Sequence, residues 1–264
     1  MILDNSGTVV LTGSTSGIGR AAALSLAALR YHLILPVRNL EKGAQLLNEI
    51  KVLGSTAELI LCDLSSLDLV RECAQEIKNK VNSVVALVNN AGVFNSTRVL
   101  TAEGYEQTMV VNHLAPCLLT LELLELIDKP DSRIINVSSQ AHRYGTLDLS
   151  DPFFERRYVP IGAYGGSKLA NIVFTTHLAH RLRFAKVFAV HPGIVATNIG
   201  GSAKGIVGIA SKMLRYFMRS PEQGCEPIVR LIVDDISKNR SGAYFNRFKD
   251  SKPSKAAQDA ELAE

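Results

Sequence analysis

The sequence predicts an α/β fold in which a doubly wound, mostly parallel sheet of seven strands carries helices on both faces. Three observations predict it. Short apolar runs alternate with longer helix-like segments, which is the rhythm of repeated strand–helix–strand units. A glycine-rich turn joins the first apolar run to the first helix-like segment. No internal repeat or linker interrupts the chain, so we expect a single domain over residues 1–264.

Each predicted strand is a short apolar run that could be buried in a parallel sheet. The strands are expected at Thr8–Leu11, Leu33–Val37, Ala57–Leu61, Val84–Val88, Arg133–Val137, Lys186–His191 and Ala243–Phe245. The segments between them have the length and composition of helices. These helices are expected at Gly19–Arg30, Leu40–Leu53, Leu67–Lys80, Glu106–Ile127, Ala163–Arg183 and Pro221–Val233.

The glycine-rich turn has the context of a dinucleotide-binding loop, because a buried strand precedes it and an Ala/Leu-rich helix follows. Glycines let the backbone turn tightly and approach a pyrophosphate, which rests on the helix N-terminus. The spacing is G-x-x-x-G-x-G, not the commoner G-x-G-x-x-G, and an ordinary glycine-rich turn is the alternative. The loop residues are Gly13, Ser14, Thr15, Ser16, Gly17, Ile18 and Gly19. They favour a Rossmann-type fold.

Tyr164 and Lys168 form the second informative pattern. They are four residues apart at the start of a helix-like segment, so the phenol and the ammonium can point into one site. A cation near a phenol favours the phenolate and lowers the pKa of the phenol. Tyr164 could then exchange a proton near neutral pH, as a carbonyl–alcohol interconversion requires. The spacing alone also arises by chance, so its meaning depends on the other motifs.

Further short motifs follow the glycine loop along the chain. In order, the motifs are Thr12-Gly13 with Gly17-Ile18-Gly19, Asp63-Leu64, Asn89-Asn90-Ala91-Gly92, Asn112, Ser138-Ser139, Tyr164-x-x-x-Lys168 and Pro192-Gly193 with Thr197. With these motifs in this order, the chain resembles the short-chain dehydrogenase/reductase family from end to end. The stretches Pro36–Asn39 with Glu41-Lys42, Val111–Leu114 and Ser167–Asn171 make it similar to the retinol dehydrogenase-like branch of that family.

The resemblance implies a catalytic set of Asn112, Ser139, Tyr164 and Lys168. Tyr164 would exchange the proton with the substrate oxygen, and Lys168 would lower its pKa and bind the nicotinamide ribose. Ser139, in preference to Ser138, would hydrogen-bond the substrate oxygen, with strand-end capping as the alternative. Asn112 would hold a water that relays protons to the lysine. The substrate would contact Ser139, Gln140 and Tyr164.

The resemblance also implies NADP(H) as the cofactor. Val37 stands where an acidic residue would bind the adenosine ribose of NAD, and Arg38 can pair with a 2′-phosphate. A solvated surface arginine is the alternative for Arg38, and a helix N-cap is the alternative for Asp63. Besides the glycine loop, the expected cofactor contacts are Arg38, Asp63, Leu64, Asn90, Ala91, Gly92, Tyr164, Lys168, Pro192, Gly193, Val195 and Thr197.

The composition argues against several other classes of protein. The net charge is a modest +4 and the basic residues are scattered, so no nucleic acid partner is expected. No apolar run is long enough to span a membrane, and a strand follows the start of the chain directly, without a signal peptide. The four cysteines are far apart, which is typical of reduced thiols in a cytoplasmic protein. His113, His142 and His191 lack acidic partners and ligand spacing, so no metal site is expected.

Two long irregular segments follow predicted strand ends, where α/β sheets bind ligands. Residues 140–162 supply Phe153, Phe154 and Tyr158 for an apolar pocket. Residues 194–220 combine glycines with apolar residues at helical spacing and are expected to form a substrate lid. A basic amphipathic helix in peripheral contact with a membrane, and a helix packed permanently on the core, are the alternatives. Residues 250–264 are expected to form a tail.

The function predicted from these observations is an NADP(H)-dependent oxidoreductase that interconverts a carbonyl and an alcohol on a hydrophobic small molecule. The alternative is a non-catalytic nucleotide-sensing protein on the same fold. The predicted helix Glu106–Ile127 is apolar around more than one face, so it is either fully buried or meets a partner. In the family this helix and Ala163–Arg183 often pair across a two-fold axis, which implies a homodimer.

Overall fold

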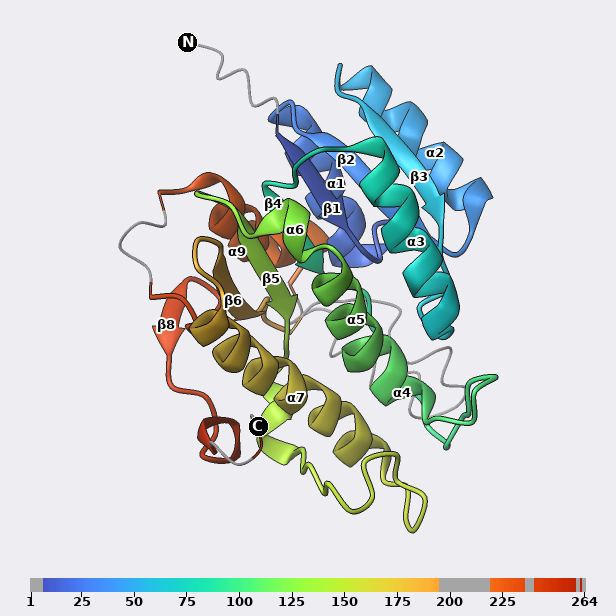
Figure 1. Cartoon of the computed structure of the whole chain (residues 1–264), viewed down its shortest axis with the longest axis vertical. Helices are drawn as coiled ribbons and strands as arrows, with labels where there is room; N and C mark the ends of the chain where they lie inside the picture. The colour runs from blue at the N-terminus through green and yellow to red at the C-terminus, as the bar shows by residue number, and fades with distance from the viewer. Residues whose placement is uncertain (1–6, 195–218, 236–239, 260–261, 263–264) are drawn as a thin grey trace.

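The computed structural model describes residues 7–194, 219–235, 240–259 and 262. The described residues form one open sheet of eight strands in the order β3-β2-β1-β4-β5-β6-β7-β8 (Figure 1). The strands β1 to β7 run parallel, and β8 pairs antiparallel with β7. The chain order reverses between β1 and β4, which places the topological switch point beside the glycine loop.

The elements follow the predicted alternation closely. The strands are β1 Thr8–Leu11, β2 His32–Val37, β3 Ala57–Leu61, β4 Ala86–Asn89, β5 Arg133–Val137, β6 Lys186–His191, β7 Tyr244–Asn246 and β8 Lys249–Ser251. The longer helices are α1 Gly17–Ala28, α2 Leu40–Val52, α3 Leu67–Lys80, α5 Ala115–Glu122, α7 Pro160–Arg181 and α9 Pro221–Val233. Shorter helical segments are α4 Gln107–Met109, η1 Val110–Leu114, α6 Leu124–Ile127, η2 Gln140–Tyr144 and η3 Ala256–Gln258.

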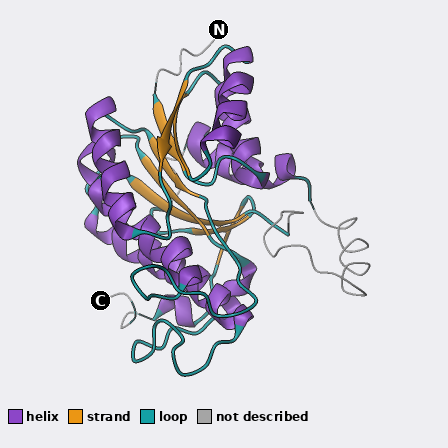
Figure 2. Ribbon diagram, turned by 90° about the vertical axis from the view of Figure 1, so that its right-hand side faces the viewer, coloured by secondary structure: helices purple, strands orange, loops and turns teal. Residues whose placement is uncertain are grey.

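Helices cover both faces of the sheet (Figure 2). Side chains of β1 alternate between two cores: Val9 and Leu11 pack with residues of α1, α2 and α9, whereas Val10 packs with residues of α3 and α5. All three are fully buried. This alternation follows from the period of two along a strand, and it explains why buried strands read as continuous apolar runs.

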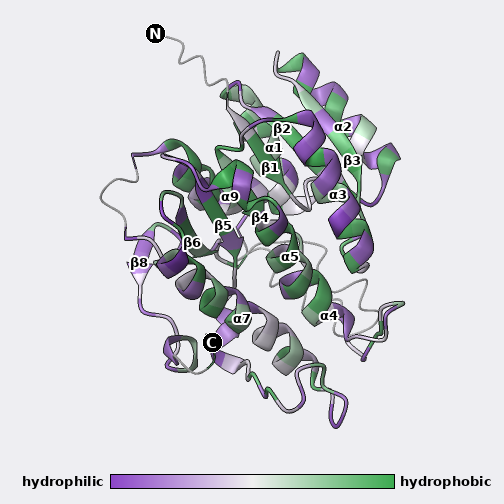
Figure 3. Ribbon diagram, in the orientation of Figure 1, coloured by the Kyte–Doolittle hydropathy of each residue, from purple (hydrophilic) through white to green (hydrophobic). Residues whose placement is uncertain are grey.

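The sheet has one strand more than the seven that the sequence predicts. The additional strand, β8, consists of Lys249, Asp250 and Ser251, and overlaps the start of the stretch 250–264 that was expected to be a tail. It is coloured as hydrophilic in Figure 3, whereas much of β3 is green. Such an edge strand faces solvent and needs no apolar pattern, which is why the sequence did not indicate it.

The helix predicted at Glu106–Ile127 is divided into four pieces. The chain passes from α4 through the π-helical turn η1 into α5, where the Ala115 N–H bonds to Val110 O five residues back. It then bends at Leu123 before α6. π-helical turns are rare in proteins, and those that occur are often found at functional sites. This one carries Asn112.

Candidate active site

The glycine loop between β1 and α1 folds closely on itself. Gly13 and Gly17 have φ values of 69° and 52°, in the left-handed region that favours glycine. A Cβ on Gly19 would lie 2.2 Å from the Gly13 carbonyl oxygen, so the helix start and the turn can approach only without a side chain there. The loop therefore brings the N-terminus of α1 to the carboxyl end of the sheet.

The residues after β4 brace this loop. The Asn90 amide donates to Thr12 O at 2.9 Å and to Gly13 O at 3.3 Å. In return, Thr12 Oγ1 accepts the backbone N–H groups of Asn90 and Ala91, each at 3.1 Å. These bonds join the ends of two neighbouring parallel strands, so Asn90 and Ala91 hold the shape of the loop as well as bordering it.

One polar group in the loop lacks a protein partner. Ser14 is fully buried, and its Oγ has no hydrogen-bond partner among the described residues. A buried hydroxyl without a partner is costly unless a ligand or water satisfies it. The glycine cradle and this hydroxyl fit the phosphates of a dinucleotide.

The side chains at the ends of β2 and β3 differ in exposure and in their hydrogen-bond partners. Val37 is buried, and Arg38 is exposed and forms no hydrogen bond or ion pair with the described residues. Asp63 accepts from the N–H and the hydroxyl of Ser65 at 2.9 and 2.8 Å. Helix α3 is capped by Ser66, not by Asp63. The alternative interpretation of Asp63 as an N-cap is therefore wrong.

Ser138 and Ser139 follow β5 and differ in their surroundings. Ser138 is buried and its hydroxyl donates to Lys168 O at 2.8 Å, which is a structural bond to α7. Ser139 is half-buried, begins η2 and accepts the Ala141 N–H at 3.2 Å. Its side chain lies near enough to Tyr164 to lower the pKa of that phenol. The geometry thus separates the two serines and brings Ser139 to the tyrosine.

Tyr164 and Lys168 lie one turn apart on α7, as their spacing predicts. Lys168 Nζ lies 5.7 Å from the centre of the Tyr164 ring and donates to Val137 O at 3.0 Å. Burial raises the pKa of Tyr164, and burial lowers the pKa of Lys168 to about 8. Contrary to the expectation that Lys168 lowers it, the pKa of Tyr164 lies above its usual value, because the loss of hydration outweighs the opposing effect of the Ser139 side chain.

Asn112 is fully buried in η1, and its side chain is engaged. Its Oδ1 accepts the Val93 N–H at 2.7 Å, and its Nδ2 donates to Val93 O and Ser167 Oγ, both at 3.0 Å. Its main-chain carbonyl accepts Asn171 Nδ2 at 2.9 Å. These bonds hold η1 against both α7 and the segment after β4.

Gly92 borders the space between Asn112 and Lys168. A Cβ on Gly92 would lie 3.3 Å from Asn112 Oδ1 and 3.4 Å from Lys168 Nζ. Both polar groups therefore face the same small space beside the backbone. Asn112 and Lys168, together with Ser139 and Tyr164, make up the predicted catalytic set. All four lie near the carboxyl ends of β4 and β5.

Several supporting contacts around these residues were not anticipated from the sequence. Phe94 packs edge to face on the Tyr164 ring, with the ring centres 5.7 Å apart. Ser167 links Asn112 to Tyr164 O, to which its hydroxyl donates at 2.8 Å. His113 donates from Nδ1 to Asn171 Oδ1 at 3.0 Å, and burial keeps the pKa of this histidine below its usual value. The polar residues at 167 and 171, on the same helix as Tyr164 and Lys168, were the available signal.

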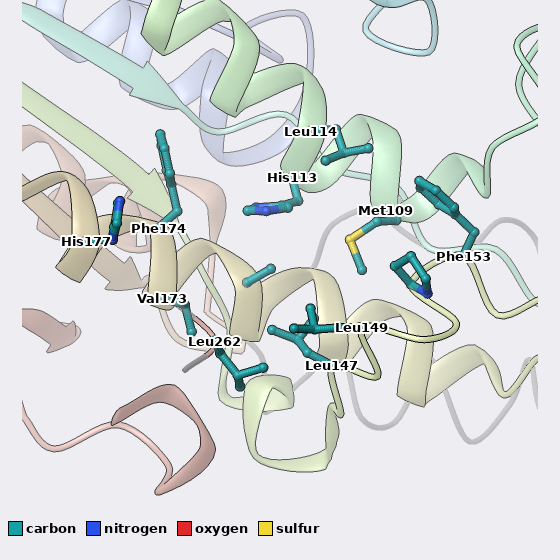
Figure 4. Close-up of a pocket in the computed structure, with 12 residues that line it drawn as sticks. Met109, His113, Leu114, Leu147, Leu149, Phe153, Val173, Phe174, His177 and Leu262 are labelled. Carbon is teal, nitrogen blue, oxygen red and sulfur yellow. The ribbon is translucent and has the colours of Figure 1, made fainter. Parts of the chain in front are cut away.

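A separate apolar pocket of about 330 Å³ lies between α4, η1 and α7 (Figure 4). Its lining on α7 comes from Ala170, Val173, Phe174 and His177, the face away from Tyr164 and Lys168. Phe153 also lines this pocket. The expected aromatic contribution of segment 140–162 is therefore present at Phe153, but in a cavity that does not include the catalytic groups.

The structure describes only part of the segment after β6, which was expected to contact the nicotinamide and to form a substrate lid. Pro192 and Gly193 follow β6 directly, and Gly193 has φ 101°. Val195, Thr197 and almost all of the expected lid lie outside the described residues. The described chain contains no helix able to cross a membrane. It also contains no group of three or more His, Cys, Asp or Glu side chains able to hold a metal ion. All four cysteines are free.

Comparisons with known proteins agree with this geometry. The sequence profile described as short chain dehydrogenase matches residues 7–205. Human "Retinol dehydrogenase 13" is 36% identical over 268 residues, covering 97% of this chain and 81% of the relative. Mouse "Retinol dehydrogenase 12" is 33% identical over 261 residues, covering 97% and 82%. A solved protein from Mycobacterium Paratuberculosis matches with a TM-score of 0.77 at 28% identity, covering 100% of this chain and 92% of that one.

The fold, the site and these relatives define a class: the chain belongs to the short-chain dehydrogenase family and is an oxidoreductase. Within that family it lies in the retinol dehydrogenase-like branch. Both levels of the resemblance inferred from the motifs are thereby confirmed.

Proposed function

We propose that the protein interconverts a carbonyl and an alcohol group on a hydrophobic small molecule, with NADP(H) as its cofactor. The observation that carries the proposal is the meeting of Asn112, Ser139, Tyr164 and Lys168. Asn112 and Lys168 face one space beside Gly92, and Tyr164 lies next to both Lys168 and Ser139. Three separate segments of the chain, η1, the turn after β5 and α7, converge to build this arrangement. A nucleotide-binding fold without chemistry would not need it.

The choice of NADP(H) rests on Val37 and Arg38. A buried valine cannot accept hydrogen bonds from ribose hydroxyls, so the end of β2 offers nothing that favours NAD. The exposed Arg38 guanidinium is free of protein partners among the described residues and can pair with a 2′-phosphate. The glycine loop and the unpartnered Ser14 hydroxyl would hold the phosphates, and Asp63 with Leu64 would border the adenine.

The bound nicotinamide would supply or accept the hydride. In the reducing direction Tyr164 donates its phenolic proton to the substrate oxygen as negative charge develops there. Ser139 donates a hydrogen bond to the same oxygen and orients it, with Gln140 beside the substrate. The ammonium of Lys168 stabilises the resulting phenolate. In the oxidising direction the same groups act in reverse.

Asn112 would support proton return to Tyr164. Its side-chain amide is already bonded to Val93 and Ser167, so a relay water would bind the main-chain carbonyl, which has a lone pair beyond the bond from Asn171. Asn112 thus shapes the relay through its backbone.

The alternative, a nucleotide-sensing protein without catalysis, is separated from this proposal by one assay. Purified protein is mixed with NADPH and a panel of retinoid, steroid, lipid aldehyde and quinone carbonyls, and the loss of NADPH absorbance is followed. The proposal expects turnover with at least one hydrophobic carbonyl. Tight NADPH binding by titration, with no oxidation across the panel, would favour sensing instead.

We also propose a cytoplasmic homodimer. The four free cysteines are consistent with a reducing compartment. Much of the apolar surface of α5 is buried within the chain, at Leu119 and Leu123, while Leu121 remains 53% exposed. Two observations therefore support a dimer: the exposed Leu121, and the pairing of the corresponding helices across a two-fold axis in the family.

A further inference from the structure

His142 connects the turn that carries Ser139 to the C-terminal part of the chain. It lies in η2, three residues after the serine, and it is fully buried. Its Nδ1 lies 2.7 Å from Ser139 O, and its Nε2 lies 3.1 Å from the backbone nitrogen of Ser254. One imidazole therefore joins the catalytic turn to the segment after β8.

The two partners determine the tautomer of this ring. Ser139 O can only accept, so Nδ1 must carry the hydrogen. The Ser254 N–H can only donate, so Nε2 must present its lone pair. An imidazolium would place an N–H against an N–H. Burial lowers the pKa of His142, which agrees with a neutral ring at neutral pH.

The surroundings hold the ring in one place. It packs edge to face on Tyr244 of β7, with the ring centres 5.1 Å apart. Arg143, the next residue, donates to Lys252 O at 3.2 Å, which is a second bond from η2 to the C-terminal segment. Farther along, Ala257 packs on Leu169 of α7. The segment after β8 is therefore anchored to the same helix that carries Tyr164.

We propose that His142 is a positioning residue for Ser139, and that the backbone of Ser254 is its second support. The proposal rests on the proposed function, in which Ser139 orients the substrate oxygen. The Ser139 carbonyl is held by both the backbone N–H of His142, at 3.1 Å, and the imidazole. These two bonds fix the direction in which the hydroxyl of Ser139 leaves the chain. What the sequence indicates as a tail is then part of the framework of the active site.

Three substitutions separate the two bonds of the ring. His142→Phe keeps the ring shape and its packing on Tyr244 but removes both bonds. His142→Asn can still donate to Ser139 O from an amide nitrogen near the position of Nδ1. His142→Gln reaches instead toward the position of Nε2, where it can accept from Ser254. We expect His142→Phe to lower kcat by about tenfold to a hundredfold, because small displacements of a catalytic group have effects of that size.

The decisive comparison is a double-mutant cycle with Ser139→Ala, read as kcat and as the Kd of NADPH. If His142 acts through Ser139, His142→Phe lowers kcat in the wild-type background but causes little further loss when Ser139 is already alanine. His142→Asn should recover most of the lost kcat, whereas His142→Gln should resemble His142→Phe. The Kd of NADPH should be unchanged throughout.

Three results would overturn the inference: normal kcat in His142→Phe, an equal loss in both Ser139 backgrounds, or equal recovery by Asn and Gln. Should His142→Phe fail to fold, the Asn and Gln variants decide alone. Normal turnover of Ser139→Ala would instead contradict the catalytic role of Ser139, and therefore the proposed function on which the inference depends.

Discussion

Gly145 and Gly165 pack backbone against backbone. A Cβ on Gly145 would lie 2.1 Å from the Gly165 carbonyl carbon, and a Cβ on Gly165 would lie 2.7 Å from Gly145 N and 2.5 Å from Ala141 O. The contact holds the turn after Ser139 against the first turns of α7. It therefore sets how closely Ser139 approaches Tyr164, the neighbour of Gly165.

This contact predicts a sharp difference between two glycines of the same helix. Gly165→Ala should lower the free energy of unfolding by at least about 2 kcal/mol, because backbone atoms cannot move aside as a flexible side chain could. Gly162→Ala is the matched control: its Cβ would lie 3.6 Å from the nearest heavy atom, an ordinary contact. It should be stabilising by up to about 1 kcal/mol, from helix propensity. Urea unfolding of both variants tests the contact, and equal stability of the two would refute it.

The cofactor preference predicts a selective effect at Arg38. Arg38→Ala should weaken NADPH binding by about tenfold to a hundredfold, the range expected for losing a hydrogen bond to a charged group. NADH binding should change little, because NADH has no 2′-phosphate. Dissociation constants of both cofactors, measured by fluorescence titration, test this. Equal changes for the two would show that Arg38 does not bind the phosphate.

The buried Lys168 predicts a conflict between stability and activity. Its pKa is lowered from 10.5 to about 8, so the folded protein loses this proton at lower pH than the unfolded chain does. The cost to folding is therefore full below pH 8 and disappears as the pH rises toward 10.5. Without cofactor at pH 7, Lys168→Met should raise the free energy of unfolding by roughly 1–3 kcal/mol and abolish turnover.

Urea unfolding of wild type and Lys168→Met over a range of pH isolates this group from the other titrating residues. The difference between the two proteins should shrink as the pH approaches 10.5. A difference independent of pH would show that the lysine is not responsible.

The proposed assembly predicts a dimer mass by light scattering at micromolar concentration. Leu121→Lys should shift the mass toward the monomer, because it places a charge on the exposed apolar part of α5. Leu29→Lys, at a similarly exposed leucine (40%) that ends α1, is the control and should leave the mass unchanged. A clean monomer mass for the wild type would contradict the proposal.

Much of the fold and the catalytic set could be predicted from the sequence, because both depend on local patterns. Apolar runs such as Val9–Leu11 are buried wherever the sheet forms, and Tyr164 and Lys168 face one site through helical geometry alone. The resemblance to the family favours Ser139 over Ser138, and the two serines differ in their hydrogen bonds.

The features that the sequence did not predict depend on contacts between distant segments of the chain. The π-helical turn at Asn112 arises where η1 bonds to Val93 and to α7, and no local pattern marks it. Strand β8 lacks an apolar face, so periodicity gives no signal. The ring of His142 gains its partner from Ser254, 112 residues away. The pairing of the two glycines was visible only as an unusual Gly165-Gly166 run, whose reason lies in the turn packed against it.

The measurement that tests the central claim most directly is turnover of Tyr164→Phe, with the Kd of NADPH measured on the same preparation. The substitution removes the phenolic proton and little else, so the fold and NADPH binding should be preserved. Carbonyl reduction should fall by at least about a hundredfold, the usual scale for a general acid. Near-normal turnover with unchanged NADPH binding would contradict the assignment of Tyr164 as the proton donor, and with it the proposed catalytic mechanism.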